Sequence, residues 1–134
     1  IGFAISNQEV IDYITRVVGP YDVNAFAVKA AFAALEDQKY IDNYVQEILK
    51  ARDWIQHKLI SHNIKHHIAG GNYLLIWPKK GAKKIQSLLK AKGILIRDMS
   101  GKELLEDSIR VSIGTQIQME RFWQSFIEEE NSSN

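Results

Sequence analysis

Two arginines in the second half of the sequence lie within apolar runs. Arg97 belongs to "GILIRDM" and Arg110 to "IRVSIGT", and both are flanked by β-branched residues, which favour strands. If both side chains point to the same edge of a hairpin, the two guanidinium groups form a fork that can hold an anion. Each guanidinium group presents planar paired donors that match a carboxylate or a phosphate. Two such groups suit a dianion. The alternative is structural, with each arginine paired to a nearby acid. The candidate acids are Asp98, Glu103, Glu106 and Asp107.

The other residues with catalytic or ligating side chains form no complete site. Gly70-Gly71 lacks the Lys-Ser/Thr end and the following helix of a phosphate loop, so we interpret it as a turn that begins a strand. No Ser-His-Asp set has local support. Four histidines are close in the sequence, but no clustered carboxylate accompanies them, and a solvated helix end fits their spacing better than a metal site. We therefore expect no metal. The histidines are His57, His62, His66 and His67.

The composition indicates an ordinary soluble domain. A length of 134 residues is enough for one domain with one core, and 46% of the residues are hydrophobic. The net charge of +1 gives no support for a nucleic-acid partner, which would need a clustered basic excess. No apolar run approaches the roughly 20 residues of a membrane span, and we find no signal peptide. The absence of cysteine excludes thiol chemistry and favours a cytoplasmic location.

The first part of the chain is predicted to contain one strand and two helices. Ile1–Ile5 is an apolar run typical of a buried strand. Ser6 and Glu9 have the spacing of a capping box for a helix that Gly19-Pro20 stops. The alanine-rich segment Ala25–Leu35 lacks a polar face, so we predict a helix that is buried on most sides.

The rest of the sequence predicts helices alternating with strands. A long amphipathic helix is expected over 37–61, and Thr115 and Gln118 form a capping box for the last helix. The predicted fold class is therefore α/β. More closely, we expect a small domain of the α+β type, in which helices cover a small, partly antiparallel sheet. The other predicted elements are strands over 73–77, 94–96 and 108–113 and a helix over 81–92 that Gly93 ends.

Several segments, in order, resemble one enzyme family. "GILIRDM", "IRVSIGT" and a capped helix with "QMERFW" are similar to the C-terminal end of histidinol-phosphate aminotransferases, which are fold-type I pyridoxal-phosphate enzymes. "IGFAISN", "GPYDVNAFAVKAAFAAL" and "GGNYLLIW" resemble further segments of that family. The resemblance runs from Ile1 to about Phe126. It implies the C-terminal domain of a fold-type I aminotransferase, with residues 1–35 as the last strand and helices connecting from a large domain and 36–134 as the small domain.

The resemblance also implies roles for three residues. Arg110 takes the place of the family's arginine that holds the acidic group of the substrate, which is the phosphate of histidinol phosphate. Arg97 takes the place of an assisting arginine. Asn24 is expected to approach the active site of a partner subunit, because these enzymes resemble one another in being homodimers. Asp22 stands where the family has asparagine.

The family's reaction implies the cofactor and the remaining partners. The parent enzyme would pass an amino group from histidinol phosphate to 2-oxoglutarate, giving imidazole acetol phosphate and glutamate, with pyridoxal 5'-phosphate as cofactor. The Schiff-base lysine of the family lies before the segment that matches Ile1. We therefore expect a C-terminal fragment that holds no catalytic residue, binds the cofactor weakly, is inactive alone, and needs the large cofactor-binding domain of the same parent chain.

Two alternatives and one further expectation accompany this interpretation. Threonine-phosphate decarboxylases and aromatic-amino-acid aminotransferases look similar in this region, so the substrate could differ within the same fold. A protein of another class, a non-catalytic module that binds an anion through the arginine fork, is the second alternative. A fragment of this kind is also expected to expose apolar surface at Ile1–Ile5 and Ala25–Leu35 and to self-associate.

Overall fold

The computed structural model describes residues 1–19 and 23–132, and these form two compact units. The first unit is Ile1–Asn43 and the second is Tyr44–Asn134. The boundary falls within one helix, α3 (Gln38–Ser61). The sequence-based division between residues 35 and 36 concerned a larger parent protein and stays a prediction. The two units are described separately below.

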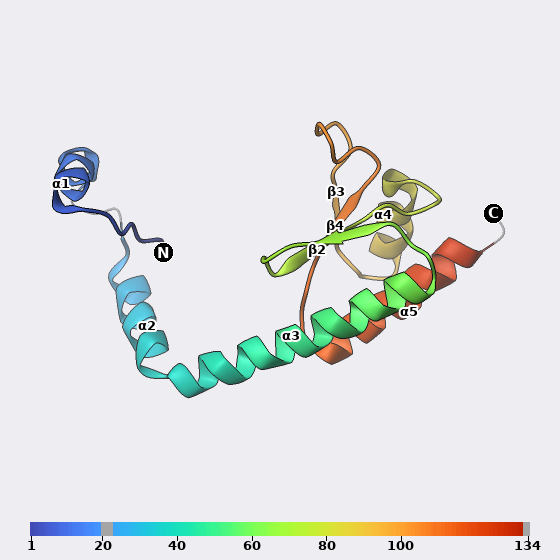
Figure 1. Cartoon of the computed structure of the whole chain (residues 1–134), viewed down its shortest axis with the longest axis horizontal. Coiled ribbons are helices and arrows are strands. Elements are labelled where there is room, and N and C mark those ends of the chain that lie inside the picture. Colours follow the sequence, from blue (N-terminus) through green and yellow to red (C-terminus); the bar gives the residue numbers. More distant parts are fainter. Residues whose placement is uncertain (20–22, 133–134) are drawn as a thin grey trace. The chain divides into compact units, whose positions relative to one another are not determined.

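The first unit consists of α1 (Gln8–Val17), α2 (Ala25–Glu36) and the beginning of α3 (Figure 1). Both short helices begin at an asparagine. The side-chain oxygen of Asn7 accepts a hydrogen bond from the Val10 N–H at 3.0 Å, and that of Asn24 accepts one from the Phe26 N–H at 2.8 Å. These bonds satisfy backbone donors that a helix start leaves unpaired.

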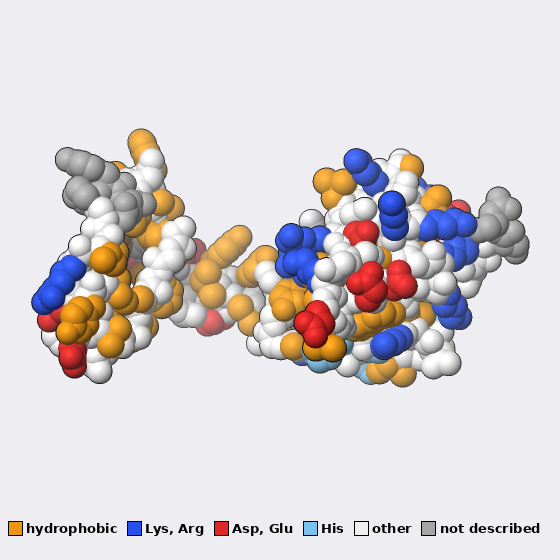
Figure 2. Space-filling model, turned by 90° about the horizontal axis from the view of Figure 1, so that it is seen from above, with side chains coloured by type: hydrophobic (Ala, Val, Ile, Leu, Met, Phe, Trp, Pro, Cys, Tyr) orange, Lys and Arg blue, Asp and Glu red, His pale blue; other side chains and the backbone are white. Residues whose placement is uncertain are grey.

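Three sequence-based predictions for the first unit are wrong. Ser6 is not the N-cap of α1, since Asn7 takes that place. Ile1–Ile5 forms no strand, because no described strand lies beside it to pair with its backbone groups. Helix α2 contains no buried residue, although its sequence is almost entirely apolar. Figure 2 shows the uncovered hydrophobic side chains of this unit. The predicted stop at Pro20 and loop at 21–22 lie outside the described residues.

The second unit is built on a four-stranded sheet with the order β1-β2-β4-β3. All of its pairings are antiparallel, so the sheet is antiparallel throughout rather than in part. The strand predicted over 94–96 is wrong in position, since the observed strand begins at Arg97. The strand His66–Ile68 was not predicted, because its three residues are too few for a periodic pattern. The strands are β1 (His66–Ile68), β2 (Tyr73–Ile76), β3 (Arg97–Asp98) and β4 (Ile109–Ser112).

Helices cover one face of this sheet and enclose the core (Figure 1). They are α3, α4 (Ala82–Ala91) and α5 (Gln116–Asn131). Burial of aliphatic and aromatic side chains is the main stabilising term for such a layer. The fully buried members include Ile55 and Leu59 of α3, Leu74 and Ile76 of β2, Ile85 and Leu89 of α4, Ile109 of β4 and Phe126 of α5.

The ends of the helices in the second unit are fixed by specific contacts. Thr115 and Gln118 form the predicted capping box at the start of α5. Gly93 has a φ of 73°, the left-handed conformation in which glycine follows a helix without strain. At the end of α5, the buried Glu130 carboxylate accepts hydrogen bonds from the Lys79 N–H at 3.0 and 3.2 Å. Across the described residues, the helices fall short of the length and apolar character that a membrane crossing needs.

Candidate functional site

The face of the sheet opposite the helices carries both predicted arginines. Side chains alternate between the two faces of a strand. Ile109 and Val111 of β4 point into the core, so Arg110 between them faces away from it. Arg97 of β3 is the direct cross-strand partner of Arg110. Residues opposite each other in an antiparallel pair have their side chains on the same face, with Cβ atoms about 4.5–5.5 Å apart. The backbone register therefore places both arginines on one face of the sheet, while their role as a fork for an anion stays a prediction.

Arg110 is held against an aromatic ring, whereas Arg97 is exposed. The Arg110 guanidinium carbon lies over the Tyr73 ring, 5.4 Å from its centroid. Arg110 is half-buried, while Arg97 lies at the edge of the sheet. The sequence analysis missed Tyr73, because its contact with Arg110 depends on the pairing of β2 with β4, two strands that are far apart in the sequence. The only sequence signal was an aromatic residue in a predicted strand.

The nearby acids make no ion pair with either arginine within the described part of the chain, where the recorded ion pairs involve Lys92. Asp98 accepts hydrogen bonds from the Ser100 backbone N–H at 2.9 Å and the Ser100 hydroxyl at 2.7 Å, and these two bonds lower the pKa of Asp98. Glu106 accepts a hydrogen bond from the Gly101 N–H at 2.8 Å. The purely structural explanation of the two arginines is thus not supported.

A second cation–aromatic pair lies farther along β2 and its extension. Trp77 is four residues from Tyr73, and its Nε1–H donates to the Glu106 carbonyl at 3.1 Å. Lys65 Nζ lies 4.6 Å from the centroid of a Trp77 ring. The Trp77 bond ties the 99–107 loop to the sheet beside the arginines. The loop is therefore part of the surroundings of this site.

Asn24 has a structural role in the described residues. Its side chain caps α2, and it belongs to the first unit. A capping oxygen is engaged with backbone and is less available for a ligand. The predicted approach of Asn24 to a partner subunit's active site stays a prediction, and Asp22 lies outside the described residues.

The histidines are dispersed in the second unit rather than gathered. His57 Nδ1 lies 2.7 Å from the Asp53 carbonyl, and His66 Nδ1 lies 2.8 Å from the Ile64 carbonyl. His66 and His67 lie on β1, so their interpretation as part of a helix end is wrong. No group of three or more histidine, aspartate or glutamate side chains suited to a metal occurs among residues 1–19 and 23–132.

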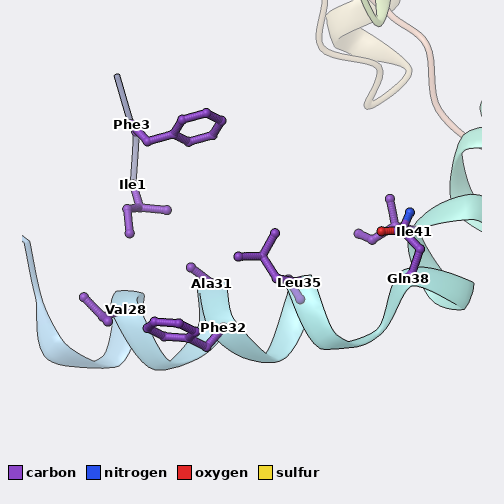
Figure 3. Close-up of a pocket in the computed structure, with 10 residues that line it drawn as sticks. Ile1, Phe3, Val28, Ala31, Phe32, Leu35, Gln38 and Ile41 are labelled. Atoms are coloured by element: carbon purple, nitrogen blue, oxygen red, sulfur yellow. The ribbon is translucent and has the colours of Figure 1, made fainter. Parts of the chain in front are cut away.

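The first unit contains an apolar cavity of about 570 Å³ (Figure 3). Phe3, Phe32 and Leu35 point toward it, and Gln38 supplies the only polar side chain of its lining. No lysine lines the cavity, so it offers no amine for a covalent bond to pyridoxal phosphate and no cation for the cofactor's phosphate. This cavity therefore does not suit that cofactor, and the expectation of weak cofactor binding stays a prediction.

Comparison with known proteins gives one family. The model for "Aminotransferase class I and II" matches residues 1–126. A histidinol-phosphate aminotransferase of Methanocaldococcus jannaschii is 32% identical over 126 residues, which are 91% of this chain and 34% of that protein. One of Geotalea uraniireducens is 34% identical over 123 residues, 90% of this chain and 35% of that protein. The chain thus spans about a third of the length of these relatives.

Solved structures support the same fold. The histidinol-phosphate aminotransferase of Clostridium acetobutylicum superposes with a TM-score of 0.81 at 24% identity, over 93% of this chain and 39% of that one. The Sinorhizobium meliloti enzyme, solved in complex with pyridoxal-5'-phosphate, gives a TM-score of 0.79 at 23% identity, over 94% of this chain and 35% of that one. At these identities the structural likeness establishes the fold.

Proposed function

This chain belongs to the class I and II aminotransferase family, and from that premise we propose that it supplies the substrate-anion contacts of a pyridoxal-phosphate-dependent aminotransferase acting on histidinol phosphate. The observation that carries the proposal is the pairing of Arg97 with Arg110 across two strands. The named relatives, which act on histidinol phosphate, support the choice of substrate.

The two arginines differ in what they contribute to binding. A phosphate monoester carries close to two negative charges at neutral pH and offers three acceptor oxygens. Arg110, half-buried and lying over the Tyr73 ring, is the principal contact, and Arg97 adds a second positive charge from the exposed edge strand. A hydrogen bond to a charged group contributes about 1.5–3 kcal/mol. The site therefore favours a dianionic phosphate over a neutral group.

The amine transfer belongs to the whole protein in this proposal. The apolar cavity of the first unit has no lysine in its lining and so offers no amine for a covalent cofactor bond. A large cofactor-binding domain, a homodimeric assembly that brings Asn24 toward a partner subunit, and a cytoplasmic location are parts of the same proposal. They are supported by the resemblance of the sequence to this family.

The test is ligand binding to the purified chain. Titrations with histidinol phosphate and with histidinol, followed by calorimetry or by ³¹P NMR of the ligand, isolate the contribution of the phosphate. We expect histidinol phosphate to bind and histidinol to bind at least tenfold more weakly. Arg110→Gln is expected to weaken histidinol phosphate binding by about tenfold or more, because one tenfold step corresponds to about 1.4 kcal/mol.

Two outcomes would contradict separate parts of the proposal. Equal binding by wild type and Arg110→Gln would mean that Arg110 does not contact the anion. Threonine phosphate binding as tightly as histidinol phosphate would leave the anion site standing and remove the assignment of the substrate. Lys90→Gln, an exposed cation on α4, controls for the general effect of losing one positive charge, because the helices cover the other face of the sheet.

A further inference from the structure

Tyr73 and Arg110 meet because of the register between β2 and β4. Tyr73 is paired with Ser112, and Arg110 is paired with Leu75. Tyr73 and Arg110 are therefore diagonal neighbours on one face of the sheet, a separation that aromatic and long side chains can bridge. The ring lies within the roughly 6 Å at which a guanidinium group is attracted to an aromatic face.

Gly71 lies directly against the same ring. A Cβ added at Gly71 would be 2.9 Å from Cε1 and 3.2 Å from Cδ1 of Tyr73. Real Cβ atoms essentially never approach another heavy atom within 3.0 Å, so the ring would have to move. Gly71 is not among the described residues with positive φ, so its backbone does not require glycine. The space beside the Tyr73 ring is the one structural reason for glycine at this position.

We infer that Tyr73 is a positioning residue for Arg110, and that Gly71 is glycine because it leaves room for the Tyr73 ring. This inference rests on the proposed anion site. An arginine side chain loses rotamer freedom when it binds a ligand, and holding it in place beforehand reduces that cost. A ring against the face of the guanidinium group leaves the donors at its edge free for an anion.

The same residues define an experiment with matched variants. Gly70 also has no positive φ, and nothing lies within 4 Å of a Cβ added there. Gly71→Ala and Gly70→Ala are thus the same change in the same turn, and only the first meets the Tyr73 ring. Tyr73→Phe keeps the ring and Tyr73→Leu removes it. Tyr73 is 41% exposed, so these changes leave the core intact.

The first readout is the position of the Arg110 side chain. In ¹H–¹⁵N spectra, the Arg110 Nε–H proton should carry a ring-current shift in the wild type, in Tyr73→Phe and in Gly70→Ala. The shift should be lost in Tyr73→Leu and changed in Gly71→Ala. A Tyr73 ring that does not hold the Arg110 side chain would leave the Nε–H shift the same in all of these variants.

The second readout is the dissociation constant for inorganic phosphate. We expect Tyr73→Leu and Gly71→Ala to weaken binding by about two- to fivefold, the range that corresponds to an exposed cation–π contact. In the Tyr73→Leu background, Gly71→Ala should add nothing, because the two changes act through one ring.

The outcomes separate this inference from the proposed function. If Arg110→Gln weakens phosphate binding while Gly71→Ala behaves as Gly70→Ala does, the positioning role is wrong and the anion site stands. If Arg110→Gln leaves phosphate binding unchanged, the anion site is wrong and the positioning role is overturned with it. An unchanged Nε–H shift in Tyr73→Leu would also overturn the positioning role.

Discussion

Arg97 and Arg110 face each other across the pairing of β3 with β4, so two positive charges share one face of the sheet. Like charges directly opposite each other destabilise an antiparallel pair. Two of the candidate acids, Asp98 and Glu106, accept hydrogen bonds from Ser100 and Gly101 instead. An anion bound between the two guanidinium groups would offset this repulsion, which leads to the first prediction.

Arg97→Gln should stabilise the chain when no anion is present. At low ionic strength and without phosphate, we expect the free energy of unfolding to rise by about 0.2–1 kcal/mol, because the cross-strand repulsion is removed. The stabilisation that phosphate gives the wild type should fall in the variant, since one of the two cations is lost. Denaturant titrations with and without phosphate measure both effects. A variant that loses stability without phosphate would show that Arg97 makes a favourable contact instead.

A second prediction concerns Glu130, which fastens the end of α5 to the turn after β2. Burial raises the pKa of the Glu130 carboxyl above its ordinary value of 4.5, while the Lys79 N–H and the charges of Lys79 and Lys80 oppose that rise. A carboxyl whose pKa is higher in the folded state gives its full stabilisation below the unfolded pKa, and this is lost as the pH rises through the folded pKa.

Glu130→Gln keeps an oxygen that can accept from Lys79 and removes the titration. The free energy of unfolding of the wild type, relative to that of Glu130→Gln, should therefore fall as the pH rises above the ordinary carboxyl pKa of 4.5. Glu130→Ala should cost about 1–3 kcal/mol, because the Lys79 N–H loses its partner. Urea titrations at several pH values measure these differences, with the exposed Glu120→Gln on the same helix as the control for charge. A difference that rises with pH would show the opposite sign of the pKa change.

The helices could be predicted from the sequence because their signals are local. Capping residues and the period of the apolar positions lie within a few turns of each other, so α3, α4 and α5 were found close to their observed bounds. Ile1–Ile5 shows the limit of such reasoning, since an apolar run becomes a strand only when another strand pairs with it. The two arginines could be singled out because each is a charged residue within an apolar run. The contact of Tyr73 with Arg110 could not be predicted, because it depends on the register between β2 and β4.

A third prediction follows from the core of the second unit, because all of the buried hydrophobic residues described lie in that unit. All three tryptophans, Trp54, Trp77 and Trp123, lie in the second unit, so their fluorescence reports on the unfolding of that unit. Phe126→Ala should lower the free energy of unfolding of the second unit by about 3–5 kcal/mol, because Phe126 is fully buried. Phe26→Ala, in the first unit and 88% exposed, should change it by less than about 0.5 kcal/mol. Equal effects of the two changes would mean that the units do not unfold independently.

The uncovered apolar side chains of the first unit lead to the last prediction. Ile1, Phe3 and Ile5 are between 78% and 91% exposed. Ile1 and Phe3 line one cavity together with residues of α2, a helix that has no buried residue. Large exposed apolar patches promote association, because association removes apolar surface from water. We expect the chain to self-associate in sedimentation velocity as its concentration rises. The combined change Phe3→Ser and Phe32→Ser should shift that association to higher concentration, whereas Leu104→Ser, an isolated exposed side chain of the second unit, should not. A monomer at all concentrations would show that the first unit covers its own apolar surface in solution.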